Sequence, residues 1–402
     1  MKVIQKLMSC SENLNLTKGK SEGEVYMLQN QKQLNVRNSS IELLRIFAMI
    51  MIVSCHFATH GGFSFDVKTL SIPRLWWNFI EMGGNLGVDI FVLISGYFLV
   101  ASNGKVFNLN RILKFWGQVF VYSIAIYFVF CIIGVHDFGL ISCINAVFPI
   151  TFGSWWFAST YFVLYLIHPF LNMLLQNLDK KTYQILIVTQ LLLWCIIPTL
   201  TSSNYQSNSL VWFVTLYSVA GYVRLFGLNP RFTTKSYLGF WVLFSVLRYL
   251  SCITLIALGT KIPFAASHSL FFYRQQSVLT FLSALSLFMV FEKLDIGYIK
   301  WINVVASATF GVYLIHDSNI IRHLLWHEVF KNAQYQDSIF LIPYSIIAIA
   351  IVYVICTLID LLRQLIIEKP FMILVNCYSE KMVRTFKTVL NVVKTFVFGK
   401  GY

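Results

Sequence analysis

Three ionisable residues interrupt an otherwise apolar stretch at residues 39–60, which reads SSIELLRIFAMIMIVSCHFATH. The stretch is long enough to cross a bilayer, yet it contains Glu42, Arg45 and His56, which a bilayer resists. Because such side chains are costly within a membrane helix, their presence favours a functional role. His56 follows Arg45 by eleven residues, or three helical turns plus about 20°. Both therefore lie on one helix face, about 16–17 Å apart along the axis, with Glu42 within about 40° of that face.

A helix face of this kind could bind an anion at one end and move a proton at the other. A neutral imidazole can take a proton from an attacking hydroxyl, while a carboxylate fixes its tautomer and stabilises the imidazolium. A guanidinium suits phosphate groups. We therefore expect His56 to be a general base and Arg45 to bind a phosphorylated ligand.

The composition is that of a polytopic membrane protein. Of the 402 residues, 57% are hydrophobic and 12% are charged, whereas a soluble domain carries about twice that charged fraction. The net charge of +14 resides mainly in short loops and at the chain ends, where it orients membrane proteins. Nucleic-acid binding is therefore not expected. The eight cysteines show neither a CxxC motif nor metal-like spacing, so neither a disulfide framework nor a metal site is expected.

We expect an all-α fold, a bundle of about ten transmembrane helices without a second folded domain. Hydropathy predicts apolar segments of helix length at residues 41–60, 84–102, 114–134, 155–176, 182–200, 210–228, 236–259, 277–293, 301–320 and 338–362. Residues 138–152 are too few to span comfortably and contain Pro149, so we expect an interfacial or re-entrant segment there.

Lysine and arginine are distributed unequally between the two sets of loops. With the N-terminus inside, the inner segments carry 23 and the outer loops carry 6, while Arg45 and Arg248 lie within helices. This asymmetry predicts that both termini are cytoplasmic in a multi-pass protein of the plasma membrane. Residues 1–38 are predicted to be a flexible polar tail, 39–370 the membrane domain, and 371–402 a basic tail that could form a surface-lying amphipathic helix.

This orientation places further ionisable residues at the expected depth of His56. Asp89, in GVDIFVLISGYFL, enters from the outer side, and His316 and Asp317, in SATFGVYLIHD, lie near the outer end of the ninth segment. Asp89 is therefore a candidate to orient His56 during proton transfer. An alternative is that Asp89 only accepts hydrogen bonds at a helix beginning, and that His56 is only a polar contact between helices.

A second group of charges is expected near the cytoplasmic surface. Arg111 and Lys114 lie one turn apart at the start of the third segment and could bind phosphates together with Arg45. Alternatively, both are ordinary positive-inside residues, and Arg45 forms an interfacial ion pair with Glu42. Arg248 lies in the middle of a segment, where a charge is expensive, so we expect it to face the bundle interior.

The motifs resemble those of the acyltransferase type 3 family over residues 39–370. The most specific element is Arg-x10-His, which Arg45 and His56 match. GVDIFVLISGYFL is similar to the family's GVD and SGF run, and the basic pair of the third segment matches its Arg-x-x-Arg with lysine in second place. Weaker similarities are WWFASTYFVLYLIHPFL, FGVYLIH and a closing Glu-Lys-Pro.

The resemblance implies a membrane enzyme that takes an acyl group, usually acetyl, from cytoplasmic acyl-coenzyme A. The acceptor it implies is a hydroxyl of a surface polysaccharide or of its lipid-linked precursor. It implies that His56 is the catalytic histidine and Arg45 an essential cation, with Arg111 and Lys114 contacting the donor. No permanently bound cofactor is implied.

Two features leave other interpretations open. The family's histidine near the ninth helix end is often followed by proline, but here Asp317 follows, so His316 is a secondary candidate, as are Glu42 and Arg248. The main alternative function is a transporter or flippase for a polysaccharide intermediate, which ten helices and buried charges would also suit. Against it, the sequence shows no inverted repeat and no matching pair of Gly/Pro-broken helices.

Overall fold

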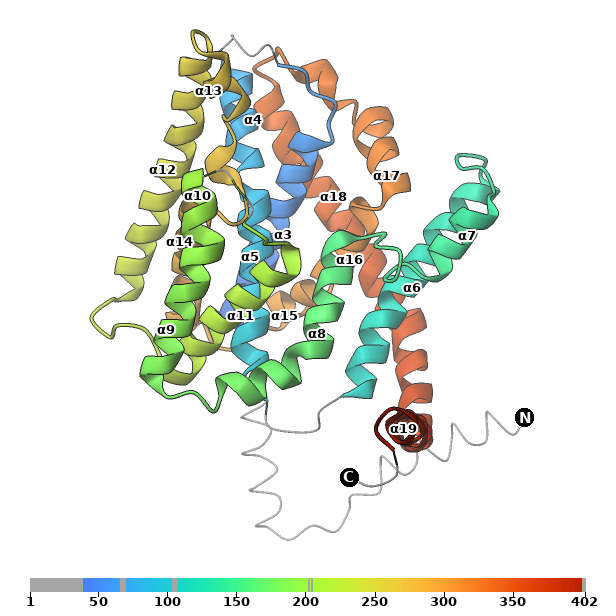
Figure 1. Cartoon of the computed structure of the whole chain (residues 1–402). Coiled ribbons are helices and arrows are strands. Elements are labelled where there is room, and N and C mark those ends of the chain that lie inside the picture. Colours follow the sequence, from blue (N-terminus) through green and yellow to red (C-terminus); the bar gives the residue numbers. More distant parts are fainter. Residues whose placement is uncertain (1–38, 66–69, 103–107, 202, 204, 400–402) are drawn as a thin grey trace. The chain divides into compact units, whose positions relative to one another are not determined.

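The computed structural model confirms the expected all-α fold, because the residues it describes form helices and no strand (Figure 1). It describes residues 39–65, 70–102, 108–201, 203 and 205–399. The tail predicted at residues 1–38 lies outside this part of the chain.

The main helices have the following bounds: α3 Ser39–Thr59, α4 Ile72–Glu81, α5 Gly83–Leu99, α6 Leu109–Ile132, α7 Leu140–Val147, α8 Trp156–Leu175, α9 Lys180–Leu191, α10 Ile197–Thr201, α11 Ser209–Phe226, α12 Thr234–Gly259, α13 Pro263–Ser267, α14 Val278–Lys293, α15 Lys300–Ser307, α16 Thr309–His316, α17 Asn319–His323, α18 Leu341–Arg363 and α19 Lys369–Phe398. Short π-helical or 3₁₀ stretches join some of them: η1 Leu192–Ile196, η2 Phe271–Tyr273, η3 Leu324–Val329, η4 Asn332–Tyr335 and η5 Gln364–Glu368.

Within the described residues, nine helices are long and apolar enough to cross a membrane, or up to ten if one bent pair is a single span. The prediction of about ten spans agrees with this number. The segment predicted at residues 138–152 contains the short helix α7, which is not among the candidate spans.

Three predicted segments differ from the observed helices. The second span begins at Ile72 rather than at residue 84, because α4 and α5 follow each other almost without a break. The ninth is not one straight helix over 301–320, because the chain bends by 76° between Lys300–His316 and Asn319–Val329. The tenth does not end near residue 362, since α18, η5 and α19 are helical without interruption as far as Phe398.

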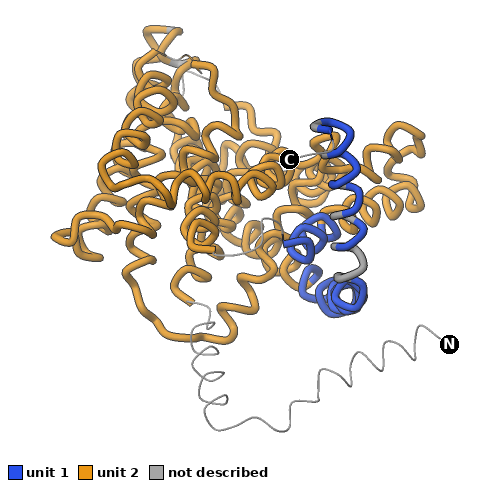
Figure 2. Tube along the Cα trace, turned by 60° about the horizontal axis from the view of Figure 1, so that its bottom comes forward, with its two compact units in different colours: residues 1–36, 107–118, 359–402 blue, residues 37–106, 119–358 orange. Residues whose placement is uncertain are grey.

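The chain divides into two compact units, coloured separately in Figure 2. Of the described residues, unit 1 contains 108–118 and 359–399, and unit 2 contains the remainder. The division falls within α6 and α18. Unit 2 therefore contains α3, α16 and α17, the helices that carry the histidine site described below.

In unit 2, α5 packs against α3, α11 and α14. Its glycines allow the close approach to α3. A Cβ added at Gly83 would lie 2.8 Å from Met51 Cβ, and one at Gly84 would lie 2.4 Å from Cys55 Sγ. Any larger residue would push these helices apart, so the glycine-rich start of α5 sets the position of the helix segment that carries His56.

Candidate active site

His56 lies near the C-terminal end of α3, where it meets the end of α16. Its Nδ1 is 2.9 Å from Nε2 of His316. His316 is fully buried, and its Nδ1 lies 2.6 Å from the carbonyl oxygen of Val312, one turn earlier in α16. His56 and His316 are 260 positions apart in the sequence. Their rings form a series of two hydrogen bonds that ends on the backbone carbonyl of Val312.

This hydrogen-bonded chain assigns the tautomers of both rings. A carbonyl oxygen can only accept, so Nδ1 of His316 carries the proton that is donated to Val312. In the neutral ring, Nε2 of His316 is then an acceptor, so Nδ1 of His56 carries the proton of the bond between them. Nε2 of neutral His56 is left with a free lone pair. That atom is the one available to take a proton from a substrate.

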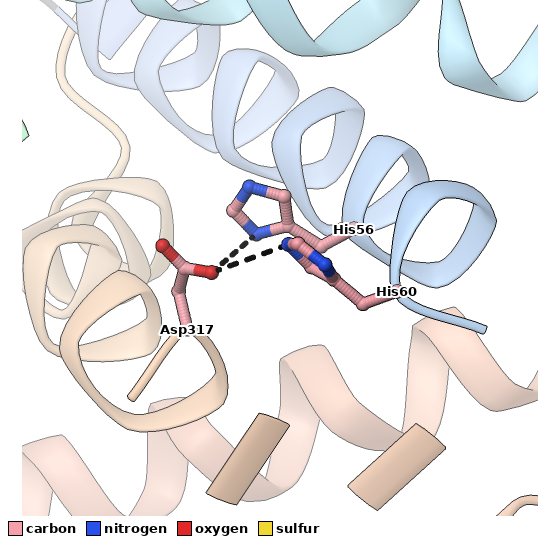
Figure 3. Close-up of side chains that lie close together, drawn as sticks. All are labelled: His56, His60 and Asp317. Carbon is pink, nitrogen blue, oxygen red and sulfur yellow. Dashed lines mark ion pairs between the residues drawn. The ribbon is translucent and has the colours of Figure 1, made fainter. Parts of the chain in front are cut away.

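A carboxylate, Asp317, and a third histidine, His60, complete the cluster (Figure 3). Asp317 is 3% exposed, and its Oδ1 lies 3.5 Å from Nδ1 of His56 and 3.7 Å from Nε2 of His60. The same oxygen accepts from the Arg322 guanidinium at 2.8 Å. The bend between α16 and α17 brings these groups together, because Asp317 lies at the end of α16 and Arg322 lies in α17. Asp317 is therefore placed to stabilise a positive charge on His56.

His60 is the cluster member that follows the end of α3. Burial lowers the pKa of His60 below its usual value, and the positive charge of Arg322 lowers it further. The carboxylate of Asp317 acts in the opposite direction, and His327 adds to the lowering. His60 is therefore held in the neutral form at neutral pH.

The cluster also has the composition of a metal site. His56, His60 and Asp317 each offer one ligand atom, and these atoms lie within 4.8 Å of one another. However, the Asp317 oxygen already accepts from Arg322, and Nδ1 of His56 is bonded to His316. A cation here would compete with a guanidinium and a ring proton, so the donor set fits a hydrogen-bonded network better than a metal centre.

Asp89 does not lie against His56. It is fully buried in α5, where its Oδ1 accepts from the indole N–H of Trp212 at 3.0 Å. The reason is helical geometry: Gly87 packs against Ala48 of α3, and Asp89 is two residues or about 200° further round α5. Asp89 was predicted to be the carboxylate beside His56. The structure has Asp317 in that position instead.

Arg248 is fully buried, as expected of a charge in the middle of a helix. Its Nη2 donates to the carbonyl oxygen of Met82 at 2.9 Å, at the junction of α4 and α5. The guanidinium also lies over the ring of Tyr273, 5.4 Å from its centroid. Its contacts therefore connect α12 to α4 and to η2, and a role in the chemistry stays a prediction.

Arg45 and Glu42 lie near the opposite end of α3 from His56. Arg45 Nε is 3.7 Å from Glu42 Oε2, an ion pair too long to be a hydrogen bond. Arg45 is 30% exposed in its side chain, and its Nε has no hydrogen-bond partner among the described residues. Because Nε is shielded from solvent, only the exposed part of the guanidinium could meet an anion, and phosphate binding by Arg45 stays a prediction.

Arg111 and Lys114 belong to unit 1. Lys114 Nζ lies 2.7 Å from Oε1 of Glu368, whose other oxygen is 2.8 Å from Arg363. Arg363 in turn binds Asp360 at 2.8 Å. Glu368 therefore partly neutralises Lys114, and a phosphate would have to compete with it. That Lys114, Arg111 and Arg45 act on one ligand stays a prediction.

Sequence reasoning missed two members of the cluster, His60 and Arg322. His60 follows His56 by four residues and so shares its helix face, which was a usable signal. Arg322 offered no such signal, because its contact with Asp317 depends on how the chain turns after α16. The sequence places Asp317 at the expected depth of His56 but gives no reason to pair the two residues.

These features define a class of protein, a helical membrane protein with a hydrogen-bonded cluster of histidines and a carboxylate at the ends of its helices. The family model described as "Acyltransferase domain", that of the acyltransferase type 3 family, matches residues 38–361, which is most of the chain. The chain belongs to this family and is a membrane acyltransferase. No curated protein and no solved structure matched the chain in the corresponding comparisons.

Proposed function

We propose that this acyltransferase moves an acyl group, acetyl in the simplest case, from acyl-coenzyme A to a hydroxyl of a glycan. The glycan is a surface polysaccharide or its lipid-linked precursor, and the enzyme acts in the plasma membrane. The observation that carries the proposal is the chain from His56 through His316 to the Val312 carbonyl. It supports a neutral His56 whose Nε2 can act as a general base.

The proposed reaction is a direct nucleophilic substitution at the thioester carbonyl carbon. Nε2 of His56 takes the proton of the acceptor hydroxyl as its oxygen attacks the carbonyl carbon. The ester C–O bond forms and the thioester C–S bond breaks, and the imidazolium then returns the proton to the departing thiolate. Asp317, 3.5 Å from His56, stabilises the imidazolium while it exists.

The donor would be bound at the other end of α3. Arg45 is about 16–17 Å from His56 along the helix axis, and its guanidinium suits a phosphate. A long phosphorylated thioester could contact Arg45 with its phosphates and present its carbonyl near His56. With the predicted orientation, Arg45 faces the cytoplasmic supply of acyl-coenzyme A.

The test is acyl transfer by a His56→Ala variant. We expect acylation of the cell's glycans, measured by mass spectrometry, to fall at least about 100-fold, because general acid–base catalysis contributes on that order or more. The matched control is His268→Ala, which changes a histidine outside the cluster, and membrane abundance is measured for both. Unchanged glycan acylation in His56→Ala at normal abundance would contradict the proposed function.

A further inference from the structure

A second polar feature lies next to the histidine cluster. A cavity of about 280 Å³ is lined by parts of α6, α7, the start of α8 and the start of α17. Its volume is close to the lower end of the range for small-molecule sites. Among the described residues its lining includes no aspartate, glutamate, lysine or arginine. The lining instead offers hydroxyl and amide groups, from Ser123, Ser142, Asn145, Ser154, Ser318 and Asn319.

Several residues that line this cavity carry a polar group without a hydrogen-bond partner in the described part of the chain. Ser123 and Ser318 are 7% and 5% exposed, and in the described part of the chain neither hydroxyl has a partner. Ser318 precedes α17, where serine normally caps a helix, but its side chain makes no capping bond. The indole N–H of Trp155, a residue 4% exposed, is also unpaired there. Because buried polar groups are normally hydrogen-bonded, these groups point to a ligand rich in neutral hydroxyls.

The walls of the cavity are built on the segments that hold the histidine cluster. Ser318 and Asn319 directly follow Asp317, whose carboxylate lies 3.5 Å from His56. On the α8 side, Trp155 is two residues before Phe157, whose ring centroid is 5.8 Å from that of Tyr313 in α16. A ligand in the cavity would therefore lie beside the end of α16, where His316 contacts His56.

Helix α7, labelled in Figure 1, carries polar side chains toward the cavity and apolar side chains on its exposed face. Ser142 and Asn145 line the cavity, whereas Leu140, Ile141 and Ile144 are 72%, 76% and 42% exposed. In a membrane protein, such an apolar outer face suits contact with lipid tails. A helix with a polar inner face and an apolar outer face would suit a ligand that reaches the cavity from the bilayer.

We infer that this cavity binds a neutral sugar ring of the acyl acceptor. The inference rests on the proposed function, and it assigns to that function an acceptor-binding subsite beside His56. Ser318 and Asn145 donate to and accept from sugar hydroxyls, and Trp155 provides an aromatic wall. The sugar can come from a lipid-linked glycan or from a soluble one.

A second cavity, of about 340 Å³, provides a control. It is also polar, but many of its polar groups already have hydrogen-bond partners. Gln276 Nε2 donates to Ser207 Oγ at 2.8 Å, and Asn85 Nδ2 donates to the Tyr273 carbonyl at 2.8 Å. A ligand would gain less binding free energy there, because these hydrogen bonds would first have to be broken.

The experiment is photolabelling of the full-length protein in phospholipid nanodiscs. The probe is dodecyl glucoside that carries a diazirine on the sugar, and labelled peptides are mapped by mass spectrometry. We expect labelling within residues 142–155 or 318–320 that excess dodecyl glucoside abolishes and dodecanol does not. A soluble glucose oligosaccharide that competes equally well indicates a soluble acceptor, and one that fails to compete indicates a membrane-anchored acceptor. Labelling elsewhere, or labelling insensitive to the sugar, overturns the inference.

Variants test the assigned contacts. We expect Asn145→Ala combined with Ser318→Ala to reduce sugar-dependent labelling about tenfold, since two hydrogen bonds are lost. Asn145→Ala combined with Ser318→Thr retains one hydroxyl and should lose less. Gln276→Ala, in the other cavity, should label like the wild type, and an equal loss in that variant overturns the assignment.

Labelling does not require acyl transfer, so the sugar site and the proposed function are tested independently. A protein that is labelled at the cavity but acylates no glycan keeps the sugar site and contradicts the proposed function. A protein that acylates glycans without labelling at the cavity keeps the function and contradicts the sugar site.

Discussion

The proton position on His56 depends on an atom two hydrogen bonds away. The Val312 carbonyl cannot donate, and this property fixes His316 and then His56 in turn. Without His316, the Nδ1 proton of His56 would lose its acceptor, and the ring could rotate or adopt the other tautomer. In the proposed mechanism, His316 is thus a positioning residue for His56.

We predict that His316→Ala lowers kcat of acyl transfer about 10- to 100-fold, the loss typical of a second partner that orients a functional histidine. His316→Gln should recover part of that loss, because its side-chain oxygen can accept the Nδ1 proton of His56. The measurement is the steady-state rate of purified protein with acetyl-coenzyme A and a glycan acceptor. Equal losses in the two variants would show that only the packing of the buried ring matters.

A pH dependence of stability follows from His60. Its pKa in the folded protein is lowered by burial and by Arg322, whereas in the unfolded chain it is about 6.5. Between these two values the unfolded chain binds a proton that the folded protein does not. Stability therefore falls as the pH drops below about 6.5, and this loss is complete at the folded pKa.

We predict that His60→Gln reduces this loss. Glutamine does not titrate, so the fall in melting temperature between pH 7.5 and pH 5.5 should be smaller in the variant than in the wild type. The measurement is thermal unfolding of detergent-purified protein at both pH values, with His268→Gln as the matched control. The account of His60 is wrong if the wild type and His60→Gln lose the same amount.

The limits of sequence reasoning are clear in this cluster. His56 and Arg45 could be found because they lie on one helix, where spacing alone fixes the face. The sequence places Asp89 and Asp317 at the same depth as His56, and the preference for Asp89 as its partner was wrong. Which of them faces His56 depends on the rotation of α5 and on the bend after α16, and neither is set by the hydropathy of its own segment.

At the scale of elements, the contact between α3 and α5 positions the site. Cβ atoms cannot be accommodated at Gly83, Gly84 and Gly87, because neighbouring atoms of α3 lie within 2.8 Å, 2.4 Å and 2.6 Å of the positions they would occupy. The segment that carries His56 is therefore held directly against the backbone of α5. Hydropathy located both helices but not the start of the second span, because the amphipathic helix α4 was not recognised as part of it.

We predict that Gly84→Ala destabilises the protein by about 1–3 kcal/mol, the usual cost of overpacking. It should also reduce acyl transfer, because Cys55, whose Sγ the new methyl would contact, is adjacent to His56. Gly239→Ala in α12 is the matched control, since a Cβ there meets no atom within 4 Å. The control should be neutral or more stable by up to about 1 kcal/mol, because alanine favours a helix over glycine. Thermal unfolding of both variants measures the difference, and equal stability would refute close packing at Gly84.

At the scale of the whole molecule, the proposed chemistry requires a defined orientation in the membrane. Acyl-coenzyme A is a cytoplasmic metabolite by the family resemblance, so Arg45 must face the cytoplasm if it binds the donor. The direction of α3 then places His56 nearer to the outer surface. The 23 basic residues assigned to inner segments and the 6 assigned to outer loops predict the same direction independently, because positive loops stay inside.

We predict that both termini are cytoplasmic and that the connection between α3 and α4 faces outward. A fluorescent protein that folds only in the cytoplasm should be bright when fused to either end. A cysteine introduced at Ser64, an exposed residue between α3 and α4, should react in intact cells with a membrane-impermeant thiol reagent. A cysteine introduced at Asp179, at the start of α9, should react only after the membrane is permeabilised. If the Asp179 position is the one labelled in intact cells, α3 runs in the opposite direction. Arg45 would then face outward, away from the cytoplasmic donor, and the proposed division of α3 into a donor end and a base end would fail.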